Sequence, residues 1–320
     1  MALPNELTEA LNTLLEGEIS FNDINYNAKE ISKKYRDNNN DGVRLVTSKQ
    51  EAISYALSRM PATYESVSDC LEKVFEKNSF EVDSVLDVGA GTGAATWALY
   101  SFFDKKNYAC FEREDEMISI GKKIMKNSVL ENNAKWTKFD IINDNIEEQY
   151  DLVVVSYMIN ELPKDQIKNI VQKLWKSTNK ILLIIEPGTP NGYSNIKQIR
   201  SILVNNGAKI IAPCPHEDEC PLPENDWCQF TCRVQRSKIH KILKDGISPF
   251  EDEKYSYIAF SKINCESADN RILRHPIINK GYSEYKVCSK NGIKNIKLSK
   301  KDGVVYKESK KKSSGDCLSI

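Results

Sequence analysis

The chain has 320 residues, 40% of them hydrophobic, so it can bury one large core or two modest ones. Lys plus Arg and Asp plus Glu each number 45, and this zero formal charge excludes a uniformly basic nucleic-acid coat protein. The absence of a run of about 18 apolar residues argues against a membrane partner, and the acidic start fits neither a signal nor a transit peptide. The sequence therefore predicts a cytoplasmic protein, and its nine cysteines, an odd number, favour reduced thiols over disulfides.

The first part of the chain, residues 1–80, is predicted to be a helical N-terminal region. Leu7, Leu11 and Leu14 recur with the spacing of one helical face. A second apolar stripe over residues 53–60 predicts a helix that ends at Pro61, and Thr63 is a plausible N-cap for a third helix.

Between residues 81 and 263, short runs rich in Val and Ile alternate with helical patterns. This alternation predicts an α/β domain with a mostly parallel sheet that helices cover on both faces. We expect strands at residues 84–88, 108–112, 136–139, 152–156, 181–186, 209–211 and 257–262, and helices at 94–103, 115–126, 165–176 and 193–205. A cysteine-rich insertion occupies about 207–240, and short glycine-punctuated segments predict a small β-rich, basic module over residues 264–320.

A glycine-rich turn follows the first predicted strand at Gly89, Gly91 and Gly93, with Asp87 just ahead of it. Glycines let a backbone approach a ligand closely, and the start of the next helix offers free N–H groups. The spacing differs from the G-x-G-x-x-G of dinucleotide-binding loops. It is similar to the first motif of S-adenosylmethionine-dependent methyltransferases, in which the loop faces the amino-acid part of the cofactor.

Two further acids, Glu112 and Asp140, end the next two predicted strands. A carboxylate at the first position can accept hydrogen bonds from both ribose hydroxyls, and one at the second can reach the adenine amino group. Each acid alone would be interpreted as a solvated strand end. Three successive strand-end acids favour a ligand site, because open α/β sheets bind ligands at this edge. The predicted cofactor pocket contains Asp87, Gly89, Gly91, Gly93, Glu112 and Asp140.

Three cysteines, Cys214, Cys220 and Cys228, fall within one loop that several prolines stiffen. Thiols at this density in a reduced protein indicate a metal site, and the residues alone do not separate zinc from an iron–sulfur cluster. Such a site needs a fourth ligand. The candidates are His216, Cys232, Cys265 and Cys288.

The segment from Lys286 to Lys312 contains ten lysines and two acids, a local net charge of +8 that leaves −8 for the rest of the chain. Such a run either keeps the protein soluble as a solvated tail or binds the phosphates of a nucleic acid.

Further segments spread over nearly the whole chain match one family. They are Arg59-Met60-Pro61-Ala62-Thr63-Tyr64, Ser156-Tyr157-Met158-Ile159-Asn160-Glu161-Leu162, Glu186-Pro187-Gly188-Thr189-Pro190, Ala212-Pro213-Cys214-Pro215-His216, Asp226-Trp227-Cys228-Gln229-Phe230, Arg233, Arg236, His240, Asp252-Glu253-Lys254-Tyr255-Ser256-Tyr257 and Lys280-Gly281-Tyr282. Together with the glycine loop, they resemble a bacterial and mitochondrial family of methyltransferase-like proteins associated with the small ribosomal subunit.

The resemblance implies a Rossmann-like class I methyltransferase sheet and a role in assembly of the small ribosomal subunit, with contacts to its rRNA and assembly intermediates. It also implies a [4Fe–4S] cluster held by Cys214, Cys220, Cys228 and Cys288, with zinc as the alternative metal. Tyr157 joins the predicted cofactor-binding residues. Away from the ribosome, we expect a monomer.

Catalysis stays open at this stage, and no catalytic residue is assigned. The segment Ser156-Tyr157-Met158-Ile159 stands where amino-group methyltransferases carry Asn/Asp-Pro-Pro-Tyr. Three functions remain: an S-adenosylmethionine-binding, iron–sulfur assembly factor that methylates rRNA, a non-catalytic RNA-binding assembly factor with a vestigial methyltransferase fold, and a zinc-containing methyltransferase of small molecules. The basic segment disfavours the third, since small substrates need no extended phosphate-binding surface.

Overall fold

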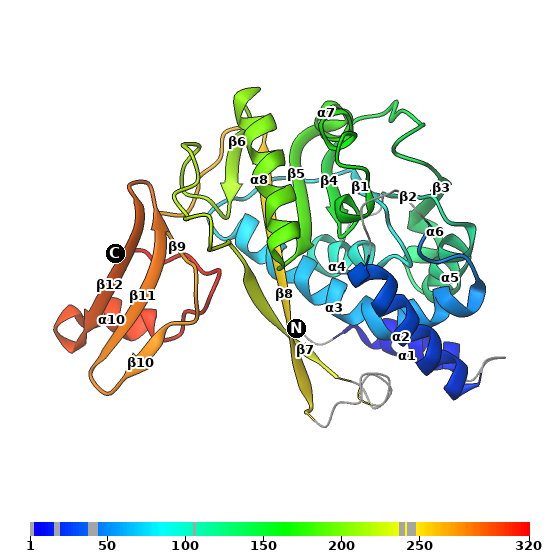
Figure 1. Cartoon of the computed structure of the whole chain (residues 1–320), viewed down its shortest axis with the longest axis horizontal. Coiled ribbons are helices and arrows are strands. Elements are labelled where there is room, and N and C mark those ends of the chain that lie inside the picture. The colour runs from blue at the N-terminus through cyan, green and yellow to red at the C-terminus, as the bar shows by residue number, and fades with distance from the viewer. Residues whose placement is uncertain (1–2, 16–19, 38–43, 105–106, 237–240, 242–247) are drawn as a thin grey trace. The chain divides into compact units, whose positions relative to one another are not determined.

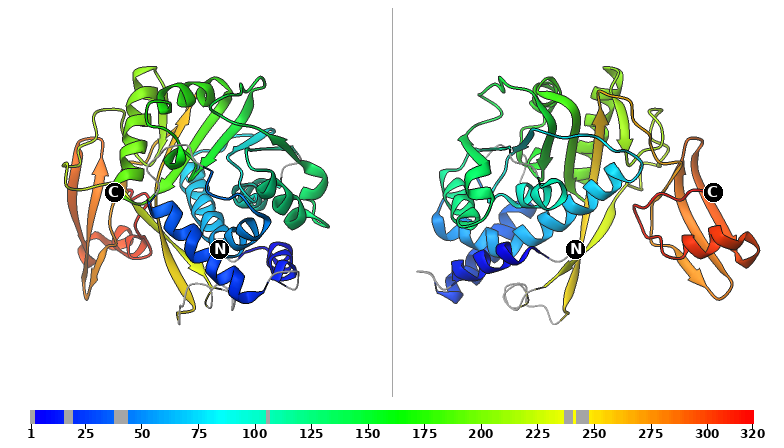
Figure 2. Two further views of the ribbon diagram at one scale, coloured as in Figure 1. Left: turned by 45° about the vertical axis from the view of Figure 1, so that its right-hand side comes forward. Right: turned by 180° about the vertical axis from the view of Figure 1, so that it is seen from behind.

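The computed structural model describes residues 3–15, 20–37, 44–104, 107–236, 241 and 248–320. The chain forms two compact units, each assembled from several segments. The first unit comprises residues 1–69, 82–179 and 232–253, and the second comprises 70–81, 180–231 and 254–320. Figures 1 and 2 show the elements from three sides.

The chain starts with three helices, α1 (Asn5–Leu15), α2 (Phe21–Asp37) and α3 (Lys49–Phe75). The stripe predicted for α1 is confirmed, because its three leucines are buried. The predicted break at Pro61 is wrong, because α3 continues through this residue. Proline removes one backbone donor from a helix. Burial of Met60 and Tyr64 on either side of it favours one continuous helix.

The sheet of the first unit contains β1 (Val85–Val88), β2 (Tyr108–Glu112), β3 (Ala134–Lys138) and β4 (Tyr150–Ser156). These strands pair in the order β3-β2-β1-β4, and every pair is parallel. Strands β1 and β4 are buried along their whole length, as expected for strands of a parallel sheet covered on both faces.

Helices follow the strands of this sheet, as the alternating pattern predicts. They are α4 (Ala94–Phe103), α5 (Asp115–Met125), the short α6 (Leu130–Asn133), the 3-10 turn η1 (Ile159–Glu161) and α7 (Ile167–Lys176). Of these, α6 and η1 lie outside the predicted helix ranges.

The second unit continues with β5 (Thr178–Pro187), α8 (Pro190–Asn205), β6 (Lys209–Ala212) and β8 (Phe250–Ser261). Strand β8 lies between β5 and β6 and runs antiparallel to both. The strand β7 (Phe230–Gln235) precedes it in the chain. With the parallel strands of the first unit, this mixed pattern is that of a Rossmann-like class I methyltransferase, which confirms the predicted fold class.

The C-terminal segment forms a small antiparallel sheet, as predicted. It consists of β9 (Asn270–Ile272), β10 (Ile277–Asn279), β11 (Tyr282–Ser289) and β12 (Gly292–Ser299), followed by the turn η2 (Lys300–Asp302) and helix α10 (Gly303–Ser309). Strand β11 pairs with the other three strands. The apolar core of this C-terminal segment includes Tyr285, Val287, Tyr306 and Leu318. The domain boundaries proposed from the sequence stay a prediction.

Among the helices that the structure describes, none has the length and apolar character needed to cross a bilayer.

Candidate functional site

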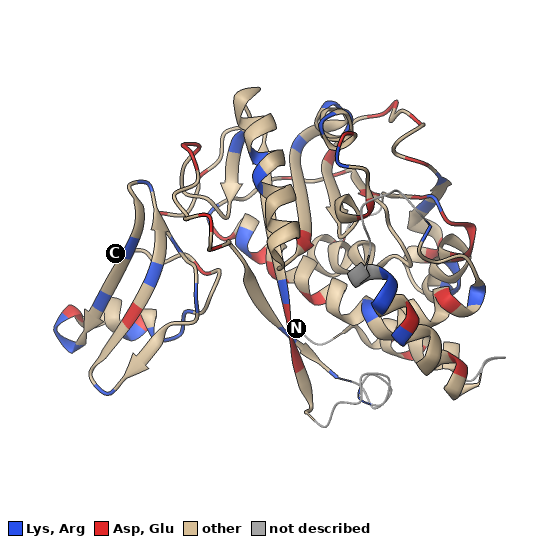
Figure 3. Cartoon of the chain, in the orientation of Figure 1, with Lys and Arg blue, Asp and Glu red and all other residues tan. Residues whose placement is uncertain are grey.

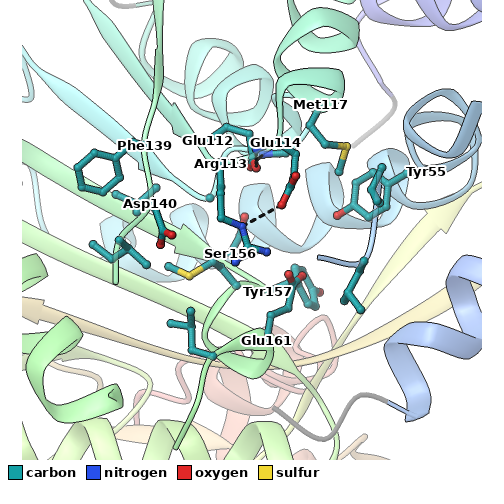
Figure 4. A pocket seen from close by; sticks show the side chains of 18 residues that line it. Tyr55, Glu112, Arg113, Glu114, Met117, Phe139, Asp140, Ser156, Tyr157 and Glu161 are labelled. Atoms are coloured by element: carbon teal, nitrogen blue, oxygen red, sulfur yellow. Dashed lines mark hydrogen bonds and ion pairs between the residues drawn. The ribbon is translucent and has the colours of Figure 1, made fainter. Parts of the chain in front are cut away.

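An open cleft in the first unit lies at the carboxyl ends of its parallel strands (Figure 4). Counted with its mouth, it has a volume of about 780 Å³. Five of the seven predicted cofactor residues line it, namely Gly89, Gly91, Glu112, Asp140 and Tyr157. The cleft therefore stands where open α/β sheets bind ligands.

The glycine loop forms one wall of the cleft. Gly89 and Gly91 have φ values of 70° and 57°, which residues with side chains rarely adopt. A Cβ atom at Gly89 would lie only 2.6 Å from Cγ of Met158, so this position has no space for a side chain. The amide of Gly91 donates a hydrogen bond of 2.8 Å to Oε2 of Glu112.

Both carboxylate oxygens of Glu112 accept backbone hydrogen bonds, one from Gly91 and one from the amide of Glu114 at 2.9 Å. Glu112 is buried, and this burial raises the pKa of its carboxyl above the usual value. The amides fix the direction of the carboxylate, and that of Arg113 contributes as well. A carboxylate has about four acceptor positions, so it can accept a further bond from a ligand hydroxyl.

Asp140 is held in a similar way on the opposite side of the cleft. Its Oδ1 accepts a hydrogen bond of 3.0 Å from the amide of Ile142, and its Oδ2 accepts one of 2.9 Å from the side chain of Asn143. The apolar residues Phe139 and Met117 also line the cleft. The combination of flat apolar walls and one oriented carboxylate suits a heteroaromatic ring with an amino group.

The other two predicted residues, Asp87 and Gly93, do not line the cleft. Gly93 is the N-cap residue of α4. Asp87 is buried, and its Oδ2 accepts hydrogen bonds from the amide and the hydroxyl of Thr96 at 3.1 and 2.8 Å. Asp87 thus fixes the first turn of α4 behind the glycine loop. Their direct contact with a cofactor stays a prediction.

Burial raises the pKa of Asp87 from 3.8 to about 7, despite the hydrogen bonds from Thr96. The folded state therefore holds this proton more tightly than the unfolded state. We expect stability to be greatest below about pH 4 as far as this group is concerned, and to fall by up to about 4 kcal/mol as the pH rises through 7. Urea unfolding at pH 5 and pH 8 checks this. The Asp87→Asn variant should lose most of the difference, and an unchanged difference would contradict the assignment.

Sequence reasoning missed a polar network beneath Tyr157, the residue after β4. Tyr157 adopts a φ of 60°, unusual for a residue with a side chain. Its hydroxyl lies 3.0 Å from Oγ of Ser66 and 3.4 Å from Oε1 of Glu253, which forms an ion pair of 3.4 Å with Arg59. The segments that contain Arg59 and Glu253 were recognised and the one with Ser66 was not, and nothing in their spacing indicates a shared network.

Sequence reasoning also missed three charged residues of the cleft, Arg113, Glu114 and Glu161. Nε of Arg113 donates a hydrogen bond of 2.9 Å to Glu114, drawn as a dashed line in Figure 4. The position of Arg113, directly after a predicted strand-end acid, was the only available signal.

A second cavity, in the second unit, brings together the four cysteines named by the resemblance. Cys214, Cys220 and Cys228 come from the loop between β6 and β7, and Cys288 comes from β11. The alternative ligand His216 also lines this cavity, with Nε2 3.8 Å from Sγ of Cys288. Cys232 on β7 and Cys265 after β8 do not line it.

Burial shifts the pKa of three of the four thiols of this cavity, those of Cys214, Cys228 and Cys288. Burial raises the pKa of Cys214 and, to well above its ordinary value, that of Cys228, and it raises the pKa of Cys288 to about 12. Neighbouring thiols raise the pKa of Cys228 and Cys288 further. These groups are therefore neutral thiols at pH 7 unless a bound cation displaces their protons.

Two buried arginines hold the cysteine loop in place. Nη2 of Arg200 donates to the carbonyl oxygens of His216, at 2.9 Å, and of Asp218. Arg271 donates to the carbonyl oxygens of Pro213 and Gly315 and forms an ion pair of 3.0 Å with Glu76. Both guanidinium groups line the cavity, so their charge offsets that of thiolates.

Asp226 connects this loop to the C-terminal sheet. Its carboxylate forms ion pairs with Arg274 and, at 3.0 Å, with Lys286, which lies two residues before Cys288 on β11. The indole of the next residue, Trp227, donates to the carbonyl oxygen of Gly188 at 3.1 Å. These contacts fix the backbone beside Cys228 and Cys288.

In the part of the chain that the structure describes, no three or more His, Cys, Asp or Glu side chains are close enough together to hold a single metal ion. Four thiols line one cavity. Thiolates are ligands of both zinc and iron–sulfur clusters.

The lysine-rich segment is folded and is not a tail. Lysines occupy β11, β12 and the surroundings of α10 (Figure 3). Lys286 pairs with Asp226 and Lys297 pairs with Glu284 at 3.2 Å. The exposed members are Lys290, Lys294, Lys297, Lys300, Lys301, Lys307, Lys310, Lys311 and Lys312. His240, quoted with the family segments, lies outside the described residues.

The strand order, the glycine loop and the cleft at the carboxyl edge define a protein of the Rossmann-like methyltransferase class, to which the second unit adds a cysteine-lined cavity. The chain belongs to the family described as mitochondrial small ribosomal subunit Rsm22, whose model matches residues 49–319. The family resemblance inferred from the sequence is therefore confirmed.

Two curated relatives are similar over much of the chain. The mitochondrial ribosome assembly protein METTL17 of Homo sapiens is 26% identical over 235 residues, which cover 68% of this chain and 50% of the human protein. The mitochondrial Rsm22-cox11 tandem protein 2 of Schizosaccharomyces pombe is 24% identical over 252 residues, 69% of this chain and 33% of the yeast protein. The chain thus spans about half the length of the human relative and about a third of the length of the yeast relative.

Solved methyltransferase structures are also similar. The N-methyltransferase NodS of Bradyrhizobium japonicum, in complex with S-adenosyl-L-homocysteine, matches 74% of this chain and 99% of its own, with a TM-score of 0.45 and 12% identity. Magnesium protoporphyrin IX methyltransferase of Synechocystis, with bound S-adenosylmethionine, matches 74% and 97%, with a TM-score of 0.42 and 11% identity.

The cytoplasmic location expected from the sequence disagrees with the descriptions of the family and of the two relatives. The matching family is described as mitochondrial, and so are the human and yeast relatives. The prediction of a cytoplasmic protein, which depended on the character of the first residues, is therefore wrong.

Proposed function

We propose that this protein is an assembly factor of the mitochondrial small ribosomal subunit that binds S-adenosylmethionine in its first unit and a [4Fe–4S] cluster in its second. The observation that carries the proposal is the convergence of Cys214, Cys220, Cys228 and the distant Cys288 on one cavity. Membership of a small-subunit family and similarity to a human ribosome assembly protein support the biological role.

In the first unit, the chain's own groups provide a complementary site for the cofactor. Gly89 and Gly91 leave space beside the loop backbone for the amino-acid part. Glu112, oriented by two amides, accepts hydrogen bonds from the ribose hydroxyls. Asp140 accepts from the adenine amino group, and the apolar Phe139 and Met117 flank the ring.

In the second unit, a donor set of four thiols is the set that a [4Fe–4S] cluster needs. The four thiols line one cavity, and two buried arginines balance the charge that deprotonation would create. When bound, the cluster would link the cysteine loop to β11 through iron–thiolate bonds. Arg200, Arg271 and Asp226 hold the loop and the strand in place for this purpose.

The exposed lysines of the C-terminal sheet and of α10 are the proposed rRNA-binding surface. They gather on one folded module, where several can reach neighbouring phosphates of one RNA strand. Away from the ribosome we propose a monomer.

We expect the triple variant Lys310→Gln, Lys311→Gln and Lys312→Gln to bind small-subunit rRNA more weakly than wild type. A variant that contacts fewer phosphates releases fewer counterions from the RNA when it binds. The slope of log affinity against log salt concentration should therefore become shallower by about 2. Filter binding at several salt concentrations measures this. The control replaces the exposed Lys122, Lys123 and Lys126 of the α5 region by Gln. Equal slopes in wild type and the first variant would make the C-terminal lysines a solubility feature only.

A second candidate function, a non-catalytic assembly factor, is favoured by the turn after β4. The hydroxyl of Tyr157 is engaged by Ser66 and Glu253, and the side chain of Met158 packs against Gly89. This turn stands where amino-group methyltransferases hold the acceptor. Transfer of a labelled methyl group to small-subunit rRNA would favour the enzyme, and cofactor binding without transfer would favour the second candidate.

The decisive experiment for the main proposal is anaerobic purification of the full chain, followed by assays for iron, sulfide, zinc and bound S-adenosylmethionine. About four irons and four sulfides per chain are expected. Colourless protein with stoichiometric zinc would refute the cluster.

A further inference from the structure

Helix α8 presents one face to the cysteine cavity. Tyr193, Ile196, Lys197 and Arg200 all line it, with the i, i+3, i+4, i+7 spacing of a single helical face. The N-terminal end of the helix is fixed by Thr189, whose side chain accepts a hydrogen bond from the amide of Gly192. Two polar side chains of this face, Tyr193 and Arg200, line the cavity together with the cysteines.

The first polar group is the hydroxyl of Tyr193, which lies 3.2 Å from Sγ of Cys220. In the free protein either atom can supply the proton. A sulfur that is bound to iron has no proton, so the hydroxyl of Tyr193 must then be the donor.

The second polar group is the guanidinium of Arg200, which is 6% exposed. It lines the same cavity as Cys214. Its Nη2 already serves two loop carbonyls. Its Nε is buried and has no hydrogen-bond partner within the described part of the chain.

The other two cysteines, Cys228 and Cys288, receive no hydrogen bond from α8 among the described residues. Cys288 belongs to an apolar cluster with Leu222 and Leu273, against which Cys228 and Cys220 also pack. Near Cys288 lies Nε2 of His216, at 3.8 Å from its sulfur. The donors that α8 supplies therefore lie among largely apolar neighbours.

We propose that α8 sets the reduction potential of the cluster, an inference that rests on the cluster proposed above. Reduction adds one electron, supplied in the test by dithionite, and makes the thiolate sulfurs more negative. The hydroxyl of Tyr193 beside Cys220, and the Nε–H of Arg200 in the same cavity, which has no partner among the described residues, stabilise this reduced form more than the oxidised one. They therefore raise the potential and make the cluster easier to reduce.

The test compares wild type with Tyr193→Phe, which removes one hydroxyl and keeps the ring. The full chain is purified without oxygen, its cluster content is measured from iron, sulfide and visible absorbance, and it is titrated with dithionite against redox dyes. The expected result is an unchanged cluster content with a more negative midpoint. At the wild-type midpoint, the ratio of reduced to oxidised cluster should fall several-fold.

The matched control is Ser201→Ala, which removes an exposed hydroxyl from the same helix, one that donates to the carbonyl oxygen of Lys197. This variant should keep the wild-type midpoint. Arg200→Lys keeps the positive charge but loses the planar fork of donors, and it should shift the midpoint in the same direction as Tyr193→Phe.

The outcomes separate the two proposals. Coloured wild-type protein whose midpoint is unchanged in Tyr193→Phe overturns the tuning by α8 and leaves the cluster intact. A coloured wild type with a colourless Tyr193→Phe variant means that the hydroxyl retains the cluster, and it also overturns tuning. Colourless wild-type protein overturns the cluster itself and this inference with it.

Discussion

Replacement of Cys288 by serine is expected to abolish the brown colour of anaerobically purified protein. Cys288 is the one cysteine of the cavity that does not belong to the loop between β6 and β7. Its loss would leave one iron of the proposed cluster without a thiolate and would remove the link through the cluster between β11 and the loop. We expect iron and sulfide to fall from about four per chain to nearly none. We also expect the unfolding temperature of the anaerobic protein to fall, since a ligand bound only to the folded state stabilises it.

Two other substitutions serve as controls for Cys288→Ser. Cys232→Ser changes a thiol that does not line the cavity, and His216→Ala removes the imidazole that lies 3.8 Å from Cys288. Both variants should keep their colour and iron content. If His216→Ala bleaches the protein and Cys288→Ser does not, the fourth ligand is the histidine and the assignment of Cys288 fails.

The Gly91→Val variant is expected to lose S-adenosylmethionine binding, with an affinity reduced by about a hundredfold or more. A β-branched residue is strained at the φ of 57° found here. The added Cβ would make ordinary contacts of 3.8 Å with Met117 and Tyr55, but the two methyl groups beyond it would fill space in the cleft. The strain would also displace the amide that orients Glu112. Titration calorimetry measures the change.

The matched control for this variant is Gly207→Val in the second unit. Gly207 is also left-handed, with a φ of 82°, and a Cβ there would meet no atom within 4 Å. This variant has comparable backbone strain without any change to the cleft, and it should bind the cofactor as wild type does. Equal affinity in wild type and Gly91→Val, or no binding by wild type, would refute the proposed pocket.

Much of the fold could be predicted because buried strands leave a strong signal. The apolar runs that became β1, β2 and β4 alternate with amphipathic segments, and β2 and α4 have the predicted bounds. The direction of β8 was not predictable, since a buried apolar run has the same pattern in parallel and antiparallel pairs. The helix break at Pro61 was predicted from a local rule that buried tertiary packing overrides.

The candidate site was predictable only in part, and for similar reasons. Residues at the ends of parallel strands necessarily meet at one edge, which is why Glu112 and Asp140 were found from their positions alone. Asp87 stands one residue before the end of β1, and its side chain turns to α4. Long-range neighbours such as Glu253 beside Tyr157 leave no mark in local spacing.

The lysine-rich segment shows that charge composition alone does not indicate whether a segment is folded. Its charge favoured a solvated tail as much as a binding surface, yet it contains buried residues such as Val287, Leu298 and Tyr306. The chain continues past α10 to pair Cys317 with Arg271. Charge patterns describe the solvent-facing side of a structure and not whether it is folded.

The cysteine loop is held by contacts that involve no sulfur, and this has a consequence for how the protein would mature. Carbonyl oxygens of the loop are bound by Arg200 and Arg271, and the loop is tied to the sheet by Asp226. A newly made chain can therefore fold before iron arrives, unlike a zinc finger, which is unfolded without its metal. The proposed cluster would then be inserted into a site that is already folded. Protein without the cluster could persist until iron is supplied, without being degraded as misfolded.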